Sequence, residues 1–413
     1  MSKSTHFTGQ PIFTQIVRLL GRDRVIELSR NNGGERYVKR FDGWTHLMTM
    51  LFAIIMRFDS LREITGSLQI QAQKLNHLGF KMMPSRSTLA DANSRRPEAF
   101  FGAVYHDLYT RYRHVLSSDS RPGRRHEGRK WLKTLQIIDS TTISLFSNLI
   151  FKGVGRHPKA GKKKGGIKVH TMIHANEGVP SDIQFTSAAT HDAFMLKPDA
   201  LKRGDIIAMD RAYIDYAKFE AMTSEGIVYV TKMKKNLRYT VESDILYQTS
   251  DGVSEIEVKH VVFTKQVKEK DPVIHRARII IYADVKKDVK LTSLLTNDME
   301  MDPEEIVEIY RRRWQIELLF KQLKQNFPLK YFYGESANAI KIQIWVTLIA
   351  NLLIMIHKRW LTRSWSFSGL ATMLRITLMS YYDFFSLFNH PEKDWERALA
   401  KEMESPPRPS LFD

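Results

Sequence analysis

The sequence predicts a mixed α/β protein in which a β-rich central region is preceded and followed by helices. Three observations lead to this prediction. Over the first 120 residues, apolar positions recur every three or four residues, which is the period of amphipathic helices. From about residue 131, short apolar runs separated by turn residues are typical of strands. Beyond residue 297 the helical period returns, and 43% hydrophobic residues in a chain of 413 suffice for a large core.

The N-terminal region is predicted to be all helical. One helix is expected over residues 42–69, with Asp42 as its N-cap. A second helix is expected to begin after Ser85 or Ser87, and a third at Pro97. We find no specific helix-turn-helix signature among these elements.

Charge sets the N-terminal region apart from the rest of the chain. Residues 1–130 contain 22 Lys and Arg against 11 Asp and Glu. Such an excess favours the binding of polyanions such as nucleic acid, because each phosphate that Lys or Arg neutralises releases bound counterions. A soluble protein with an ordinary basic surface is the alternative. Ser, Gly, Pro and charged residues mark a linker at 121–130, so we predict a basic helical domain over residues 1–120.

The central region, residues 131–330, has the element order of a ribonuclease-H-like fold. The predicted elements are a strand, a tight turn and a second strand over 132–146, a third strand over 165–176, a helix over 193–202, a strand over 206–209, a helix over 213–225 and a strand over 226–233. A three-strand meander followed by alternating strands and helices is the layout of that fold. A strand-rich stretch at about 234–297 is predicted to be a β insertion, and one long helix is expected from Asp302 or Pro303 to Asn326.

Two carboxylates lie where predicted strands end, and a third lies on the long helix. Asp139 and Asp210 each follow an apolar strand. Active sites of open α/β sheets gather at the carboxyl ends of strands. Glu317 lies on the long helix, which we expect to pack on the sheet and direct this carboxylate towards the strand ends. A single Asp after a strand is usually a turn or cap residue, so the prediction depends on the combination of the three.

The long helix carries a polar stripe. At 100° per residue, its Tyr310, Arg313, Glu317 and Lys324 fall within about 60° of one another. A stripe of this composition is more often a solvated face with local ion pairs. Beside a carboxylate site, however, Arg313 and Lys324 are expected to hold the DNA backbone, because their charges suit phosphate groups.

The predicted cofactor is Mg²⁺, for which Mn²⁺ is expected to substitute. Asp139, Asp210 and Glu317 supply the hard oxygen donors that these ions prefer, and two such ions promote in-line displacement at a phosphodiester. No nucleotide cofactor is expected, because the Gly- and Lys-rich stretch at 151–168 lacks the residue order of a phosphate-binding loop. Within that stretch Lys162, Lys163 and Lys164 are predicted to form a hairpin tip that either touches DNA phosphates or is simply solvated.

The motifs resemble those of a known family. The segment IYRRRWQIELLFKQLKQN (309–326) resembles the YREK signature of DDE transposases of the fourth insertion-sequence family, which is matched at Tyr310, Arg313, Glu317 and Lys324. LQIIDSTT resembles the family's first Asp region at Asp139, and MDRAYIDY resembles the second at Asp210. The resemblance covers about residues 130–330, and the helical N-terminal region is also similar to those that precede this core in bacterial insertion-sequence transposases.

The resemblance implies a ribonuclease-H-like fold with an inserted β-subdomain, Mg²⁺-dependent cut-and-paste transposition, and recognition of DNA ends by the N-terminal region. It also implies cleavage through a hairpin at the transposon end, and a Trp in the β insertion that holds a flipped base. Residues 234–297 contain no Trp, so this aromatic residue is unassigned. Tyr239 and Phe263 are candidates by residue type, although a core position is the favoured interpretation for both.

Several classes of protein are excluded or disfavoured. The chain has no Cys, which excludes disulfides, thiolate zinc sites and a Cys nucleophile. Its N-terminus lacks the apolar segment of a secretory signal, so we expect a cytoplasmic protein. The resemblance implies that it is bacterial and associated with the nucleoid. The 15-residue apolar stretch at 342–356 is too short to span a bilayer. It is predicted to be a buried helix in a C-terminal helical region over 331–413, and Trp314 and Trp345 are predicted to be core residues.

The sequence therefore predicts a DNA transposase that acts on terminal inverted repeats and target DNA, as a homodimer in the end-bound complex and with no membrane partner. Two alternatives stay open. One is a structure-specific nuclease of the same fold, which cleaves strands but never joins them. The other is a non-catalytic DNA-binding protein or domesticated repressor that keeps the fold and charge without the chemistry.

Overall fold

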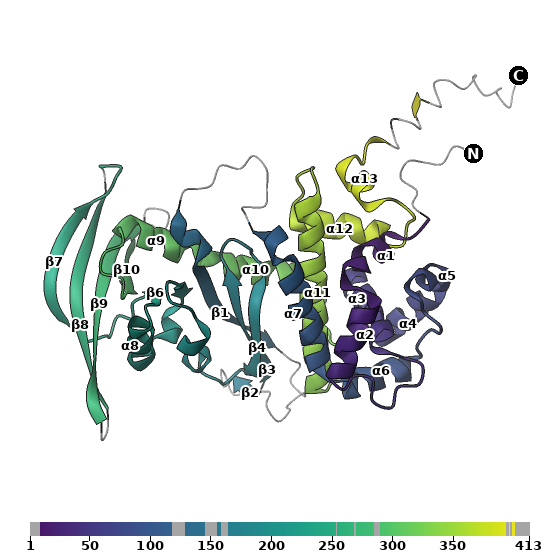
Figure 1. The fold of residues 1–413 in the computed structure, drawn as a ribbon, viewed down its shortest axis with the longest axis horizontal. Helices are drawn as coiled ribbons and strands as arrows, with labels where there is room; N and C mark the ends of the chain where they lie inside the picture. Colours follow the sequence, from purple (N-terminus) through teal and green to yellow (C-terminus); the bar gives the residue numbers. More distant parts are fainter. Residues whose placement is uncertain are drawn as a thin grey trace, which may run out of the picture. The chain divides into compact units, whose positions relative to one another are not determined.

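The protein is seen in a computed structural model that describes residues 9–117, 129–144, 155–157, 164–252, 254–267, 270–284, 290–393, 396 and 399–400 (Figure 1). The fold is mixed α/β, with one large sheet and with helices towards both ends of the chain. Two compact units are present: Met1–Val115 with Gln322–Asp413, here called the helical unit, and Leu116–Lys321, here called the sheet unit.

The helical unit combines helices from both ends of the chain. Its helices are α1 (Ile12–Val17), α2 (Arg22–Asn31), α3 (Gly43–Met56), α4 (Leu61–Ile70), α5 (Ala72–Leu75), α6 (Arg86–Arg95), α7 (Glu98–Leu116), α11 (Ala337–Trp360), α12 (Phe367–Thr377) and α13 (Phe384–Asn389). Helix α3 is buried along nearly its whole length and packs against α11. Two predicted N-caps are confirmed: Asp42 accepts a hydrogen bond from the Thr45 N–H at 2.7 Å, and Ser85 accepts one from the Thr88 N–H at 3.1 Å.

The prediction of one helix over 42–69 is wrong, because the helix is interrupted between α3 and α4. Arg57 adopts the left-handed conformation with φ 60°, and its N–H returns to the carbonyls of the last turn of α3, as in a common helix stop. Ser60 then caps α4 by accepting from the Glu63 N–H at 3.3 Å. The Ser-x-x-Glu pattern is a helix start signal, and it outweighs the apolar periodicity that continues through the break.

Helix α11 forms the apolar centre of the helical unit. It has 24 residues, so the predicted 15-residue helix was too short, and by length and composition alone α11 is able to cross a membrane. Within its most apolar window, however, 89% of the residues are buried inside the protein. Burial of this kind is what a central core helix requires, and Trp345 on this helix is buried as predicted.

The sheet unit is built on a ten-stranded sheet. Its strands are β1 (Leu135–Ser144), β2 (Gly155–His157), β3 (Lys164–His174), β4 (Pro180–Ser187), β5 (Ile206–Met209), β6 (Val228–Lys232), β7 (Thr240–Gln248), β8 (Glu255–Val267), β9 (Lys270–Asp284) and β10 (Lys290–Thr296). The order is β2-β3-β1-β5-β6-β10-β9-β8-β7, with β4 also paired to β3. Strands β1, β5 and β6 are parallel, whereas β1 pairs with β3, and β3 with β4, in antiparallel fashion. Helices α8 (Tyr216–Ser224) and α9 (Pro303–Arg312) pack on the sheet, and α10 (Trp314–Asn326) follows α9.

Three details of the central prediction are wrong. β1 is one continuous strand, because the Thr-rich segment after Asp139 keeps its pairing with β3 through Ser144 instead of turning. The third strand of the meander is β4, which the weak apolar pattern of its sequence did not reveal. The helix expected over 193–202 is replaced by two short 3₁₀ turns, Asp192–Met195 and Pro198–Ala200.

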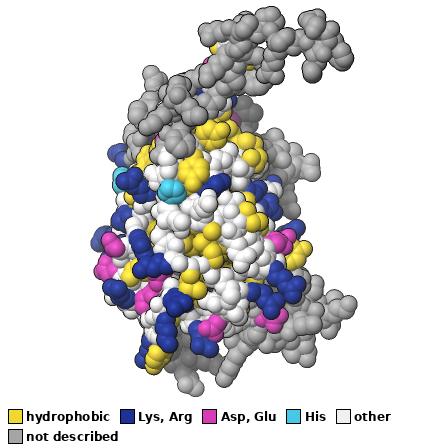
Figure 2. All heavy atoms as spheres, turned by 90° about the vertical axis from the view of Figure 1, so that its right-hand side faces the viewer, with side chains coloured by type: hydrophobic (Ala, Val, Ile, Leu, Met, Phe, Trp, Pro, Cys, Tyr) yellow, Lys and Arg dark blue, Asp and Glu magenta, His cyan; other side chains and the backbone are white. Residues whose placement is uncertain are grey.

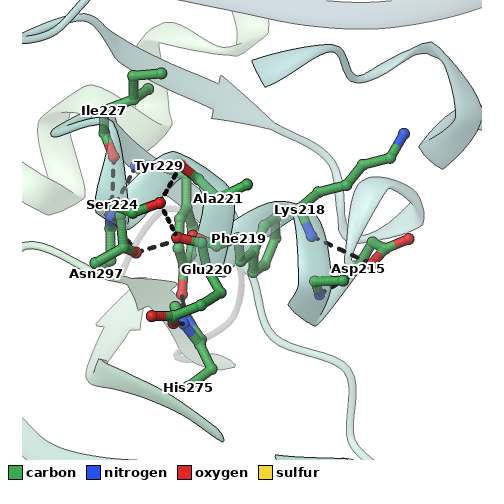
Figure 3. A network of polar contacts seen from close by, with 12 residues as sticks. Asp215, Lys218, Phe219, Glu220, Ala221, Ser224, Ile227, Tyr229, His275 and Asn297 are labelled. Atoms are coloured by element: carbon green, nitrogen blue, oxygen red, sulfur yellow. Dashed lines mark hydrogen bonds and ion pairs between the residues drawn. The ribbon is translucent and has the colours of Figure 1, made fainter. Parts of the chain in front are cut away.

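A buried hydrogen-bond network joins β9 to β6 and α8 (Figure 3). The imidazole of His275 is fully buried, with Nδ1 2.8 Å from Glu220 Oε2 and Nε2 2.6 Å from the Tyr229 hydroxyl. Burial lowers the pKa of His275, although the Glu220 carboxylate opposes that shift. Because a carboxylate only accepts, Nδ1 donates to Glu220 and the Tyr229 hydroxyl donates to Nε2. The network thus ties the long strand β9 to β6, at the centre of the sheet.

Replacing Tyr229 by Phe is expected to lower the free energy of unfolding by about 1–3 kcal/mol, because the buried Nε2 of His275 loses its donor. Urea unfolding at pH 7.5 measures the change. Tyr247→Phe is the matched control, since the Tyr247 hydroxyl bonds to Asp302 at 2.8 Å in an exposed position. Equal losses in the two variants would contradict the structural role of the buried network.

Candidate active site

The strand register places Asp139 and Asp210 side by side. Ile138 of β1 pairs with Met209 of β5, and each Asp is the next residue along its strand direction. Neighbouring strands lie about 4.8 Å apart, so the two carboxylates leave the sheet from adjacent backbones. Asp139 lies inside β1, opposite Thr171 of β3, and not at a strand end as predicted. The pairing of β1 with β5 nevertheless ends at Ile138, the residue before Asp139. On β5, the residue after the last pair is Asp210, which is followed by a 3₁₀ turn.

Arg313 links Asp139 to Glu317. Its Nη1 donates to Asp139 Oδ2 at 3.0 Å and its Nη2 donates to Glu317 Oε1 at 2.5 Å. The predicted single helix over 302–326 is broken at this residue into α9 and α10, because the N–H of Arg313 bonds to the Tyr310 carbonyl at 3.1 Å in a tightened turn. The arginine side chain is 13% exposed, so two charged hydrogen bonds form in a largely dry environment.

Burial dominates the electrostatics of Asp139. It raises the pKa of this carboxyl to about 6, and the negative charges of Asp210 and Glu317 act in the same direction. The Ser140 N–H, which donates to Asp139 Oδ1 at 2.7 Å, and the Arg313 guanidinium oppose the shift. Asp210 and Glu317 are therefore each close enough to Asp139 to repel its negative charge.

Tyr310 lies at the same place. Its pKa is raised, chiefly by burial and also by the charge of Asp210, while Arg313 opposes the shift. The guanidinium carbon of Arg313 is 5.7 Å from the centre of the Tyr310 ring, which is a cation–π distance. The structure thus brings together five residues singled out in the sequence: Asp139, Asp210, Tyr310, Arg313 and Glu317.

The remaining predicted residues are placed differently. Lys324 is exposed on α10, beyond the point at which the chain passes from the sheet unit into the helical unit. Lys164 begins β3 opposite His157 of β2, whereas Lys162 and Lys163 lie outside the described residues.

The aromatic candidates divide between core and surface. Phe263 is buried as expected, but Tyr239 is exposed, so a core position is wrong for it. Trp314, next to Arg313, is 53% exposed, and its prediction as a core residue is also wrong.

One acid near the site is missing from the predicted residues. Asp192 Oδ1 accepts from Ser140 Oγ at 2.7 Å and lies 3.3 Å from Lys168 Nζ. Ser140 is the residue after Asp139, so Asp192 supports the backbone that carries the first carboxylate. From the sequence, Asp192 is a candidate to approach the site but is interpreted as a helix start, and it does begin the 3₁₀ turn Asp192–Met195. Its approach to β1 depends on β4, which was not recognised in the sequence.

The chemistry of these side chains fits a divalent ion. Carboxylate oxygens are the donors that Mg²⁺ and Mn²⁺ prefer, and the mutual repulsion at Asp139 is what a bound cation offsets. Among the described residues, no three acidic or imidazole groups are gathered closely enough to enclose an ion. Instead the Arg313 guanidinium supplies the positive charge between Asp139 and Glu317.

Comparison with known proteins identifies a family whose model matches the part of the chain that contains these residues. The model of a family described as transposase DDE domain matches residues 130–353, and that of a domain of unknown function matches residues 8–81. The protein named "Putative transposase y4zB" of Sinorhizobium fredii is 29% identical over 280 residues, which cover 67% of this chain and 73% of that protein. "Putative transposase for insertion sequence element IS4SA" of Synechocystis sp. is 25% identical over 324 residues, 77% of this chain and 85% of that protein.

A third relative is "Probable transposase for insertion sequence element IS5377" of Geobacillus stearothermophilus, which is 25% identical over 252 residues, 60% of this chain and 61% of that protein. The family match spans β1, β5 and α10, the elements that carry Asp139, Asp210 and Glu317. Since that match covers more than half of the sequence, the chain belongs to the DDE transposase family.

Proposed function

We propose that this protein is a DNA transposase of an insertion sequence that cuts and joins phosphodiester bonds with divalent ions held by Asp139, Asp210 and Glu317. The observation that carries the proposal is the pairing of Ile138 with Met209, which puts two acids on adjacent strands, together with the Arg313 bridge to the third. A strand order of β4-β3-β1-β5-β6, antiparallel and then parallel, supports a ribonuclease-H-like core, into which β7 to β10 are inserted.

Each part of the site has a proposed task. Asp139, Asp210 and Glu317 would hold Mg²⁺, or Mn²⁺ in its place, and the bound ion would supply activation of the attacking hydroxyl and stabilisation of the leaving oxygen. Arg313 and Lys324 hold the DNA backbone, with Tyr310 against the DNA end. The run Lys162 to Lys164 contributes phosphate contacts.

The proposed reaction uses no nucleotide cofactor. Water first cuts one strand at the transposon end and leaves a 3′-hydroxyl. That hydroxyl then attacks the opposite strand, which closes the transposon end into a hairpin and releases the flanking DNA. A second water opens the hairpin and restores the 3′-hydroxyl, which finally attacks target DNA. Each step exchanges one phosphodiester oxygen for another in line.

The proposal extends to the organisation of the chain. Residues 1–120 recognise the terminal inverted repeats, residues 121–130 link them to a catalytic domain over 131–330, and residues 331–413 complete the protein. Two ends must be held together, so the end-bound complex is a homodimer. The protein acts in the cytoplasm, associated with the nucleoid of a bacterium.

A strand-transfer assay tests the proposal. Pre-cut duplexes carrying the element's own end are incubated with supercoiled target DNA and Mg²⁺, and joined products are expected. Cleavage of uncut ends without joining would favour a structure-specific nuclease. Binding of the ends with neither cleavage nor joining, in Mg²⁺ or Mn²⁺, would favour a non-catalytic DNA-binding protein.

Arg313→Gln is expected to move the acid limb of the nicking rate to higher pH. A positive charge 3.0 Å from Asp139 lowers the pKa of that carboxyl, so its removal raises the pKa, and a protonated Asp does not hold a cation. Nicking rates at fixed Mg²⁺ between pH 5 and 8.5 measure the shift.

Arg312→Gln is the control for this shift, because Arg312 pairs with Glu308 at 3.0 Å instead of with the three acids. It is expected to keep the parental profile. Identical profiles for the parent and Arg313→Gln would show that Arg313 does not set the charge state of Asp139.

A further inference from the structure

The loop between α2 and α3 carries an unusual set of exposed side chains. Arg36, Tyr37, Lys39 and Arg40 are all exposed, and Tyr37 is 95% exposed. No hydrogen bond or ion pair joins these three cations to another part of the described chain. The two acids of the same loop, Glu35 and Asp42, are by contrast occupied by bonds within the protein. The loop therefore presents unneutralised positive charge around an aromatic ring.

The base of the loop is held by a buried arginine. Arg96 is 5% exposed, and it donates from Nε to the Gly34 carbonyl at 2.9 Å and from Nη2 to the Phe41 carbonyl at 2.7 Å. Glu35 Oε1 accepts from Ser29 Oγ at 2.5 Å and from the Gly43 N–H at 2.7 Å. Both ends of the loop are thus fixed by charged hydrogen bonds.

Two glycines make this closure possible. A Cβ at Gly34 would lie 2.5 Å from Ser29 Oγ, and one at Gly43 would lie 2.3 Å from the same atom. The close approach leaves no room for a side chain at either position. A simple connection between two helices does not require a buried guanidinium and two positions where only glycine fits. We therefore take the conformation of this loop to be specifically stabilised.

Tyr37 is held in a strained conformation at the tip. Among the described residues, Tyr37 and Arg57 are the two non-glycine residues with positive φ, at 58° and 60°. Arg57 ends a helix, where this conformation is common. Tyr37 occupies the third position of a turn closed by Val38 N–H to Glu35 carbonyl at 3.3 Å, a position that favours Gly. Strain of this kind persists where the surrounding structure imposes it, and it is concentrated at functional sites.

We propose that residues 36–40 are a DNA-contacting tip, in which Arg36, Lys39 and Arg40 bind backbone phosphates and the Tyr37 ring stacks on a base or sugar. Cations beside an aromatic ring are the combination that binds unpaired nucleotides, and the Tyr37 ring is already 95% exposed. The inference rests on the proposed function, since it takes DNA as the polyanion. It assigns a role within residues 8–81, the segment that matches a domain of unknown function.

The helical unit, which carries the tip, has a face on which positive side chains are in excess. Figure 2 shows one face of the helical unit, on which more Lys and Arg than Asp and Glu side chains are visible. Of the exposed cations of α2, Arg24 pairs with Glu27 and Asp107, and Arg22 lies 3.7 Å from Asp42. Arg30 lies in the last turn of the helix, next to the loop. A polyanion that contacts the tip therefore meets one further positive charge, that of Arg30.

The test measures binding of the full-length protein to a duplex carrying the element's own end, from 50 to 300 mM salt. Tyr37→Gly is expected to weaken binding about tenfold, as the loss of one stacked base does, without lowering the melting temperature, because Gly adopts positive φ freely. Tyr37→Phe keeps the ring and is expected to bind as the parent does. The triple change R36Q/K39Q/R40Q is expected to reduce the slope of log affinity against log salt by about three, one unit for each lost phosphate contact.

Arg62→Gln serves as the matched control, since Arg62 is an exposed arginine of the same unit on α4. It is expected to change the salt slope by less than about one unit. If the parent binds and cleaves the ends while the tip variants bind them equally well, the tip is not a DNA contact and the proposed function stands. If the control weakens binding as much as a tip variant does, the effect is one of general charge. A parent that binds no DNA would overturn both the tip and the proposed function.

Discussion

Glu317→Gln is expected to reduce nicking of the transposon end in Mg²⁺ by about 10³-fold or more, because one of three carboxylates that hold the ion becomes neutral. The amide keeps the size of the side chain and still accepts from Arg313, so folding and end binding are expected to be retained. Single-turnover nicking and gel-shift binding on the same end duplex separate the two properties.

Glu308→Gln is the control for that result. Glu308 lies on the preceding helix, where it pairs with Arg312 at 3.0 Å, outside the group formed with Arg313. This variant is expected to nick at the parental rate. Full nicking by the Glu317 variant would reject the assignment of the third carboxylate.

Asp139→Asn is expected to abolish nicking to the same extent and, unlike a change at an exposed acid, to stabilise the metal-free protein. The pKa of Asp139 is raised to about 6 in the folded protein from 3.8. The unfolded chain therefore releases this proton at lower pH than the folded protein does. Above pH 6 the ionised Asp139 carboxylate thus lowers the free energy of unfolding. The neutral amide of the Asn variant is expected to raise that free energy by about 1–3 kcal/mol above pH 6, and the difference disappears as the pH falls to about 4.

Urea unfolding in a chelator from pH 4 to 8 measures this gain. Asp199→Asn, at an exposed position of the same unit, is expected to show no such dependence. A variant at Asp139 that is no more stable than the parent at pH 8 would show that the Arg313 ion pair outweighs the cost of burying the carboxylate.

Local patterns in the sequence predicted most of the elements but not where they break. Apolar periodicity is continuous through Arg57 and Arg313, yet both helices are interrupted there. The hydroxyl-bearing residues after Asp139 are compatible with a turn as well as with a strand. They form a strand because they pair with β3, which is distant in the sequence. Such choices depend on tertiary partners that a window of ten or fifteen residues does not contain.

The sequence singled out the three acids and Arg313 as candidate site residues, but it did not show which of them contact one another. Spacing on one helix drew attention to Arg313 and Glu317, but the hydrogen bond from Arg313 to Asp139 joins positions 174 residues apart. Asp192 was left out of the site as a helix start, because its approach to Ser140 depends on β4, which was not recognised in the sequence. That the acids hold an ion, and that the helical unit binds DNA ends, stay predictions.

The divided helical unit has a consequence for synthesis on the ribosome. Helix α3 emerges early, but α11, against which its apolar surface packs, is made only after residue 336. The intervening segment Leu116–Lys321 is contiguous and has all its strands available first. The part of the chain that is translated first is therefore expected to reach its native packing last, and a nascent chain that stalls before α11 leaves an apolar helix without cover.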